Sequence, residues 1–252
     1  MMTTLALLRT EWRRLWMRPF AWILAALTSA AMAWQLVLML GPFLQRQDKL
    51  LASGANIGYT DLVLLPWLAL FVVAMMLLAP LVTMSMLASE RRNGNLPMLV
   101  ACGLPPWRIV TGKYLAALGW MLTLLAIPLL MVLALAFSGT PDWGKLAAAA
   151  LGLVLLAATV SAIGLACSAC ASHPALACAG ALVISLALVL IDQAALADGP
   201  IQAVAQWLAL PAHLRPMGRG LVDTADIAWF VIVTAVALGL AILRLRRDGE
   251  RD

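Results

Sequence analysis

Residues 146–191 read LAAAALGLVLLAATVSAIGLACSACASHPALACAGALVISLALVLI and contain no Asp, Glu, Lys or Arg. A helix needs about 20 apolar residues to cross the hydrocarbon core of a bilayer, so this stretch is long enough for two crossings. Its one polar break, Ser172-His173-Pro174, ends in a proline, which lacks the amide proton that a helix interior requires. The stretch therefore predicts two spanning helices, at 146–171 and 175–191, joined by a tight turn.

Four further charge-free runs each have the length of one crossing. Hydrophobic residues make up 64% of the chain and charged residues 12%, whereas a soluble domain has roughly 45–50% and 25%. This composition excludes a water-soluble globular domain. We predict an all-α integral membrane protein that forms a single transmembrane domain over residues 1–252. The other four spans are predicted at 20–40, 62–88, 108–137 and 226–245.

Lys and Arg residues are distributed unevenly between the two sides of the predicted spans. Six crossings put both termini on one side, and that side has 12 Lys and Arg residues against 5 on the other. Because cytoplasmic loops carry an excess of Lys and Arg, we predict cytoplasmic termini and a multi-pass protein of the bacterial inner membrane. The net charge of +5 is then a topology signal, and nucleic acid is not an expected partner.

The residues before the first span predict an amphipathic helix on the membrane surface. Apolar side chains recur at helical spacing from Leu5 to Trp16, and Arg9 and Arg13 occupy the other side of the helix. Indole rings such as those of Trp12 and Trp16 favour the membrane interface, and arginines favour anionic lipid head groups. A topology signal without folded structure is the alternative.

The loop between the last two spans predicts a short helix. Pro200 is followed by an amphipathic run that ends at Leu208, and Pro211 comes soon after it. Such a helix is too short to cross, so we expect it at the outer interface or as a re-entrant element shielded by protein.

Small residues recur at four-residue steps in the fourth span, where Gly164 and Ser168 accompany them. Small side chains let helix backbones approach closely, which favours packing either within the chain or between subunits. The members of this stripe are Ala158, Ala162, Ala166 and Cys170.

Residues 89–114, SERRNGNLPMLVACGLPPWRIVTGKY, predict a short cytoplasmic helix between the second and third spans. Asn95 is suited to cap its start, Gly103 can take the left-handed conformation that stops it, and the two following prolines prevent its continuation. This helix exposes Leu96, Leu99 and Val100 between basic flanks. An exposed apolar surface of this kind favours a partner groove or the bilayer surface, and an ordinary interfacial loop is the alternative.

The order of residues in this stretch resembles the permeases of the ABC-2 type transporter family. The match runs through Glu90-Arg91, Gly94, Leu96, Leu99, the two prolines, Ile109 and Gly112-Lys113. Within the family, residues 213–230 are most similar to the gliding-motility GldF and NosY-like permeases. The resemblance implies that the ATPase-coupling residues are Glu90, Arg91, Gly94, Asn95, Leu96, Leu99, Val100 and Gly103. It implies a hinge to the next span formed by Pro105, Pro106, Arg108, Gly112 and Lys113.

The same resemblance implies the partners. An ABC ATPase, as a separate nucleotide-binding subunit, would sit on the short cytoplasmic helix and hold the ATP and Mg²⁺, so no cofactor is expected in this chain. A second copy of the permease, or a related one, would complete a dimer, in contact with membrane lipids and with an envelope accessory protein as a further candidate partner.

Motifs for chemistry in this chain are weak. Gly112-Lys113 lacks the earlier glycine and the following Ser or Thr of a phosphate-binding loop. Cys167, Cys170 and His173 have a metal-like spacing, but the apolar surroundings favour structural packing and no metal site is expected. We found no nucleophile or metal constellation of an intramembrane hydrolase and therefore do not expect an enzyme.

Three functions follow from these observations. The favoured one is the permease subunit of an ABC exporter, driven by a separate ATPase. The second is a membrane scaffold that recruits an ATPase to regulate an envelope process. A secondary transporter or channel is least favoured, because the predicted spans place no ionisable residue at bilayer depth, where ion-coupled carriers need one.

Overall fold

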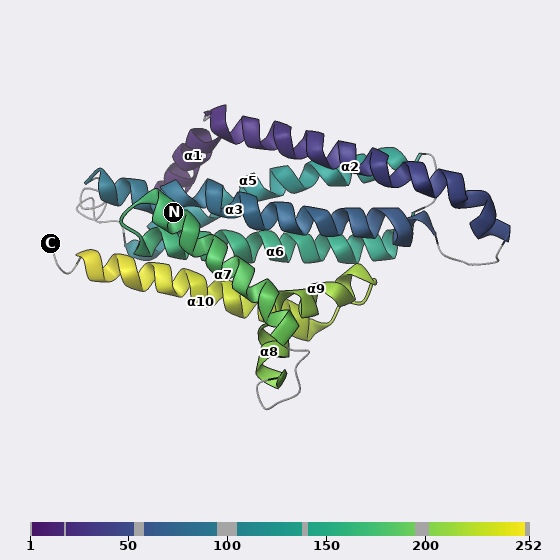
Figure 1. Ribbon diagram of the computed structural model, residues 1–252. Coiled ribbons are helices and arrows are strands. Elements are labelled where there is room, and N and C mark those ends of the chain that lie inside the picture. Colours follow the sequence, from purple (N-terminus) through teal and green to yellow (C-terminus); the bar gives the residue numbers. More distant parts are fainter. Residues whose placement is uncertain are drawn as a thin grey trace.

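The computed structural model describes residues 2–17, 19–52, 58–94, 105–137, 141–194 and 202–249, which form helices and no strand (Figure 1). Six of the described helices are long and apolar enough to cross a membrane, which agrees with the predicted number. The spanning helices are α2 Pro19–Ala52, α3 Leu65–Arg92 with a preceding π-helical turn η1 Thr60–Leu64, α5 Pro106–Leu135, α6 Trp143–Cys170, α7 Pro174–Ala194 and α10 Thr224–Gly249.

The predicted turn between the fourth and fifth spans is confirmed. α6 ends where Ala171 takes an extended conformation and its N–H bonds the Cys167 carbonyl oxygen at 3.0 Å. α7 begins at Pro174, whose missing amide proton is not needed in the first turn of a helix. The other predicted spans also coincide with helices, with ends that differ by at most four residues, except that α2 continues to Ala52, 12 residues beyond the predicted end at residue 40.

α6 is the central helix of the bundle and the most buried of the six spans. It packs against α3, α5, α7 and α10, whereas α2 runs along one edge in contact with α3 and α5 (Figure 1). Large aromatic side chains fill the core around it, with Trp67, Phe71, Trp120, Trp229 and Phe230 nearly inaccessible. A membrane span buried on most sides needs apolar residues all round, which is why α6 has no polar face.

Small residues allow α6 to approach α3. A Cβ atom on Gly164 would lie 2.1 Å from Thr83 Oγ1, so only glycine fits there. Ser168 Oγ accepts hydrogen bonds from the amides of Leu87 and Ala88, both at 3.1 Å, and donates to the Met84 carbonyl oxygen at 3.0 Å. This part of the small-residue surface therefore serves packing within the chain. Of the predicted stripe, Ala162 is buried and Cys170 is exposed.

The N-terminal segment forms the predicted helix, α1 Met2–Met17, which packs against α5. The Trp16 ring contacts the edges of Trp22 and Trp120, with centroid separations of 5.1 and 5.6 Å. A Cβ atom on Gly119 would lie 2.0 Å from the Trp12 ring, so a glycine is required where α1 crosses α5. α1 is thus docked on the bundle through its tryptophans, and its position at a membrane surface stays a prediction.

The connection before α10 contains two short helices rather than the single one that was predicted. α8 Gln202–Leu208 and α9 Leu210–Gly218 are separated at Ala209, whose extended backbone precedes Pro211 near the start of α9. Leu210 and Met217 are buried where α9 packs on α6. The predicted short cytoplasmic helix, in contrast, lies outside the described residues, which end at Gly94 and resume at Pro105.

The two ends of the bundle are held by different polar contacts. At the end that contains α9, Lys145 Nζ donates to both carboxylate oxygens of Asp61, at 2.7 and 2.8 Å. At the same end His213 stacks on Trp229 and its Nδ1 lies 2.7 Å from Asp226 Oδ1. The opposite end contains α1, the last turn of α3, the first turns of α5 and the end of α10 (Figure 1). We call these the α9 end and the α1 end.

Candidate functional site

A buried cluster of charges joins three helices at the α1 end. Lys113 Nζ donates hydrogen bonds to Glu11 Oε1 at 3.0 Å and to Glu90 Oε1 at 2.7 Å. These residues come from α5, α1 and α3, and the Lys113 side chain is only 1% exposed. We call Glu11, Arg14, Glu90 and Lys113 the charge cluster.

Helical periodicity explains how Lys113 becomes buried. It lies on the same face of α5 as Ile109, Ala116 and Trp120, which are all buried. Moving an ammonium group into that environment is strongly unfavourable unless carboxylates pair with it. Glu11 and Glu90 are these carboxylates. Because Glu11 belongs to α1, its ion pair with Lys113 helps to hold α1 on the bundle.

Arg14 covers the cluster from the solvent side. Its guanidinium lies 3.4 Å from Glu11 Oε1 and 3.6 Å from Glu90 Oε1, and its side chain is 64% exposed. The second oxygen of Glu90, Oε2, is buried without a hydrogen-bond partner among the described residues. A cavity of about 430 Å³ adjoins the cluster and is lined by Glu11, Arg14, Ser89, Glu90 and Asn93 together with apolar and small side chains.

A second set of contacts fixes the end of α3 on its other side. Arg91 forms an ion pair with Asp248 near the end of α10, and it donates to the Ala171 carbonyl oxygen, after α6, at 3.3 Å. Gly94 follows with a φ of +70°, a backbone conformation that favours glycine. The consecutive residues Glu90 and Arg91 therefore connect the end of α3 to four other helices immediately before residues 95–104.

The predicted coupling residues divide into two groups. Glu90 is buried and faces Lys113, Arg91 is half-buried, and Gly94 is exposed. Since Glu90 is paired inside the bundle, its contribution in this structure is to hold α3 to α1 and α5. The other predicted coupling residues lie outside the described residues; they are Asn95, Leu96, Leu99, Val100 and Gly103.

The predicted hinge residues form the start of α5. Pro105 is extended, Pro106 occupies the first helical position, and the Arg108 amide bonds the Pro105 carbonyl oxygen at 2.9 Å. Gly112 is buried beside Lys113, which turns out to be a member of the charge cluster. In α1, Arg9 and Arg13 are exposed, and Trp12 and Trp16 are half-buried, so these four residues lie on the predicted sides.

Sequence reasoning missed Glu11 and Asp248. Glu11 lies four residues before the buried Leu15, so it falls on the apolar side of α1 and not among the arginines. A lone acidic residue on an apolar helical face was the available signal. Sequence reasoning also did not predict that a charge is buried inside a span: Lys113 lies in the third candidate span, near the end of that span at the α1 end.

Comparison with known proteins agrees with the architecture. Residues 46–211, well over half of the chain, match the family described as ABC-2 family transporter protein. No curated protein matches the chain. The proposed likeness to GldF and NosY-like permeases stays a prediction. With six apolar helices and this match, the chain belongs to the ABC-2 family of transporter membrane proteins.

Proposed function

We propose that this chain is the membrane-spanning permease subunit of an ABC exporter, and that a separate ATPase subunit drives it from the cytoplasmic side. Membership of the ABC-2 family supports the permease role and association with an ABC ATPase, often as a dimer. ATP and Mg²⁺ would bind the ATPase and not this chain. The termini, and with them the α1 end, would face the cytoplasm of a bacterium.

The observation that carries the proposal is the charge cluster beside residues 95–104. These residues are flanked by Gly94, four positions after Glu90, and by Pro105, eight positions before Lys113. The buried Lys113 ties α5 to α1 and α3 through hydrogen bonds of 3.0 and 2.7 Å, and removing one partner of such a buried pair typically lowers stability by about 3–5 kcal/mol. A force applied to residues 95–104 would therefore be transmitted to α3, α5 and α1 together.

The buried charges do not favour an ion-coupled carrier. Lys113 is the eighth residue of α5, about 10 Å from the start of that helix, whereas such carriers bind ions near the middle of the bilayer. Both carboxylates of the cluster already face Lys113. The cluster therefore fits a structural connection at the α1 end better than a site that binds and releases a coupling ion.

The test is co-purification of the ATPase with a tagged permease from native membranes, with associated subunits identified by mass spectrometry. Leu99→Asp places a charge on the apolar surface predicted for residues 95–104, so we expect at least a tenfold loss of the ATPase. Val222→Asp, at an exposed position of the α9 end, is the matched control and should retain it. Equal recovery of the ATPase with both variants would refute the proposed coupling.

Reconstitution separates export from scaffolding. A permease–ATPase complex in liposomes should hydrolyse ATP faster when its cargo is added and should move that cargo across the bilayer. Hydrolysis without any transport, in a screen that includes amphiphiles, would support the scaffold function instead.

A further inference from the structure

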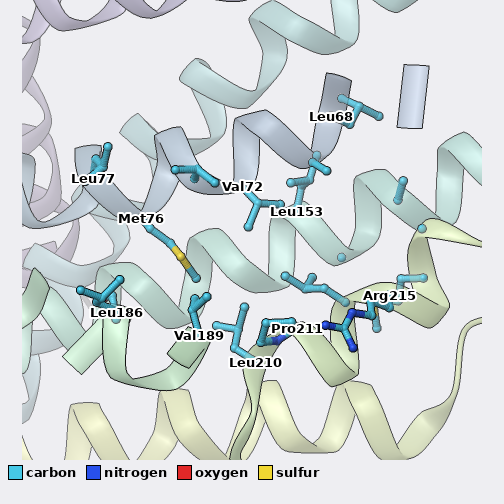
Figure 2. Close-up of a pocket in the computed structure, with 18 of the residues that line it drawn as sticks. Leu68, Val72, Met76, Leu77, Leu153, Leu186, Val189, Leu210, Pro211 and Arg215 are labelled. Carbon is cyan, nitrogen blue, oxygen red and sulfur yellow. The ribbon is translucent and has the colours of Figure 1, made fainter. Parts of the chain in front are cut away.

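A cavity of about 600 Å³ lies between α3, α6, α7 and α9 (Figure 2). This volume lies within the roughly 300–1,000 Å³ range of small-molecule sites. Its walls are almost wholly apolar, with Leu68, Val72, Met76, Leu153 and Val189 among the residues that line it. The charge cluster lies at the other end of the bundle, so this cavity is a separate feature.

The cavity occupies the half of the bundle toward the α9 end. Its lining residues on α3 run from Leu65 to Leu77, which at 1.5 Å per residue corresponds to about 18 Å along the helix. That length is a little over half the thickness of a bilayer core of about 30 Å. With the α1 end in the cytoplasm, as proposed above, the cavity lies in the outer half of the membrane.

The cavity is elongated, because its lining follows α3 for about 18 Å. The cavity is also open sideways, because Val73, Leu77 and Val183 on its rim are more than half exposed. A hydrocarbon chain can therefore enter it from the bilayer.

Two of the residues that line the cavity, Arg215 and Ser185, have polar side chains. Arg215 lies at one end and Met76 and Leu77 at the other (Figure 2). One guanidinium nitrogen of Arg215 pairs with Asp192, and the side chain is 61% exposed, so its other N–H donors remain accessible to a further acceptor. Ser185 also lines the cavity; the residue is 3% exposed, and its hydroxyl has no hydrogen-bond partner among the described residues.

We propose that this cavity binds the cargo, and that the cargo is an amphiphile with a hydrocarbon chain and an anionic head group. The chain lies along Val72 and Val189 toward Met76, and a carboxylate or phosphate head group accepts hydrogen bonds from Arg215 at the α9 end. This polarity gradient matches a lipid-like molecule in the outer leaflet. The assignment rests on the proposed function, because it names the substrate class of the same permease.

The test uses a palmitic acid that carries a photoreactive diazirine near its chain terminus, with the purified permease in lipid nanodiscs, with and without its ATPase. Val72→Trp places a bulky ring in the path proposed for the hydrocarbon chain and should reduce labelling of the lining peptides at least tenfold. Val231→Trp makes the same change at an exposed position of α10 outside the cavity and should label like the wild type. Thermal unfolding of both variants establishes that each is folded.

A second pair of variants tests the head group. Arg215→Gln should weaken labelling by the carboxylate probe at least tenfold and leave labelling by the matching diazirine hexadecanol unchanged. Arg219→Gln, an exposed arginine at the end of α9, should change neither. Wild-type labelling of Val72→Trp, labels outside the lining, or cross-links from the lining to a second copy of the chain would overturn the assignment. Failure of the ATPase co-purification, with cavity labelling intact, would refute the coupling and leave the binding site standing.

Discussion

Lys113 is 1% exposed and bridges carboxylates from α1 and α3. Lys113→Met keeps an unbranched apolar side chain of similar length but removes the ammonium group, which leaves Glu11 and Glu90 buried without it. Removing one partner of a buried pair costs about 3–5 kcal/mol because the remaining charge is uncompensated. We expect a clearly lower thermal unfolding midpoint in detergent, measured by tryptophan fluorescence.

Arg14→Met is the matched control for this prediction. Arg14 approaches the same two carboxylates, but its side chain is 64% exposed. Exposed ion pairs contribute about 0–1 kcal/mol, so this variant should unfold close to the wild-type midpoint. Equal losses of stability in the two variants would show that burial of Lys113 does not decide the strength of the cluster.

Single residues were predictable from sequence only where a local pattern places them. The exposed arginines and half-buried tryptophans of α1 follow from helical spacing alone. The charge cluster does not, because Lys113 pairs with a residue 102 positions away and with another 23 positions away. Charges beside apolar spans also serve as topology signals, and sequence spacing cannot distinguish that role from a buried pair.

At the scale of elements, the contact between α3 and α6 depends on Gly164. Gly164→Ala would place a Cβ atom 2.1 Å from Thr83 Oγ1 and 3.1 Å from Thr83 Cβ, so the two helices must move apart. Overpacking of this kind lowers stability by about 1–3 kcal/mol, more than the helix propensity gained by alanine. We expect a lower unfolding midpoint, partly restored by Thr83→Ala, which removes the nearest oxygen.

Gly239→Ala in α10 is the control for Gly164→Ala, and we expect it to cause no loss of stability. Among the described residues, no atom outside the adjacent backbone of α10 lies within 4 Å of a Cβ placed there, so the substitution should be neutral or slightly stabilising. A loss of stability for Gly239→Ala as large as that for Gly164→Ala would mean that glycine is needed for backbone reasons and not for the approach of α3.

The spanning elements were largely predictable, and their irregularities were not. Long charge-free runs and Pro174 are enough to place six spans, because the bilayer admits few alternatives to a helix. The end of α8 at Leu208 agrees with the predicted end of the short helix before Pro211, but the second helix, α9, was not predicted. α9 packs on α6 through the buried Leu210 and Met217, a tertiary contact that the local sequence does not reveal.

At the scale of the whole molecule, the two ends of the bundle have different chemistry. The α1 end holds a buried charge cluster, and the other half holds an apolar cavity. α3 passes through both, since Glu90 belongs to the cluster and Val72 lines the cavity, and Ser168 of α6 bonds the α3 backbone between them. A displacement of the last turn of α3 would therefore reach the cavity wall through a single packed helix.

An ATPase can push on the last turn of α3 only if the α1 end of the bundle faces the cytoplasm. In a variant without the native cysteines, Asn93→Cys and Arg219→Cys place exposed thiols at the α1 end and the α9 end. An impermeant maleimide added to right-side-out vesicles should label Arg219→Cys at once and Asn93→Cys only after permeabilisation, because 12 of the 17 Lys and Arg residues flank the α1 side. Labelling of both thiols after permeabilisation establishes that each is reactive. Labelling of Asn93→Cys in sealed vesicles would place residues 95–104 outside the cell, where no ATP-driven subunit could push on them.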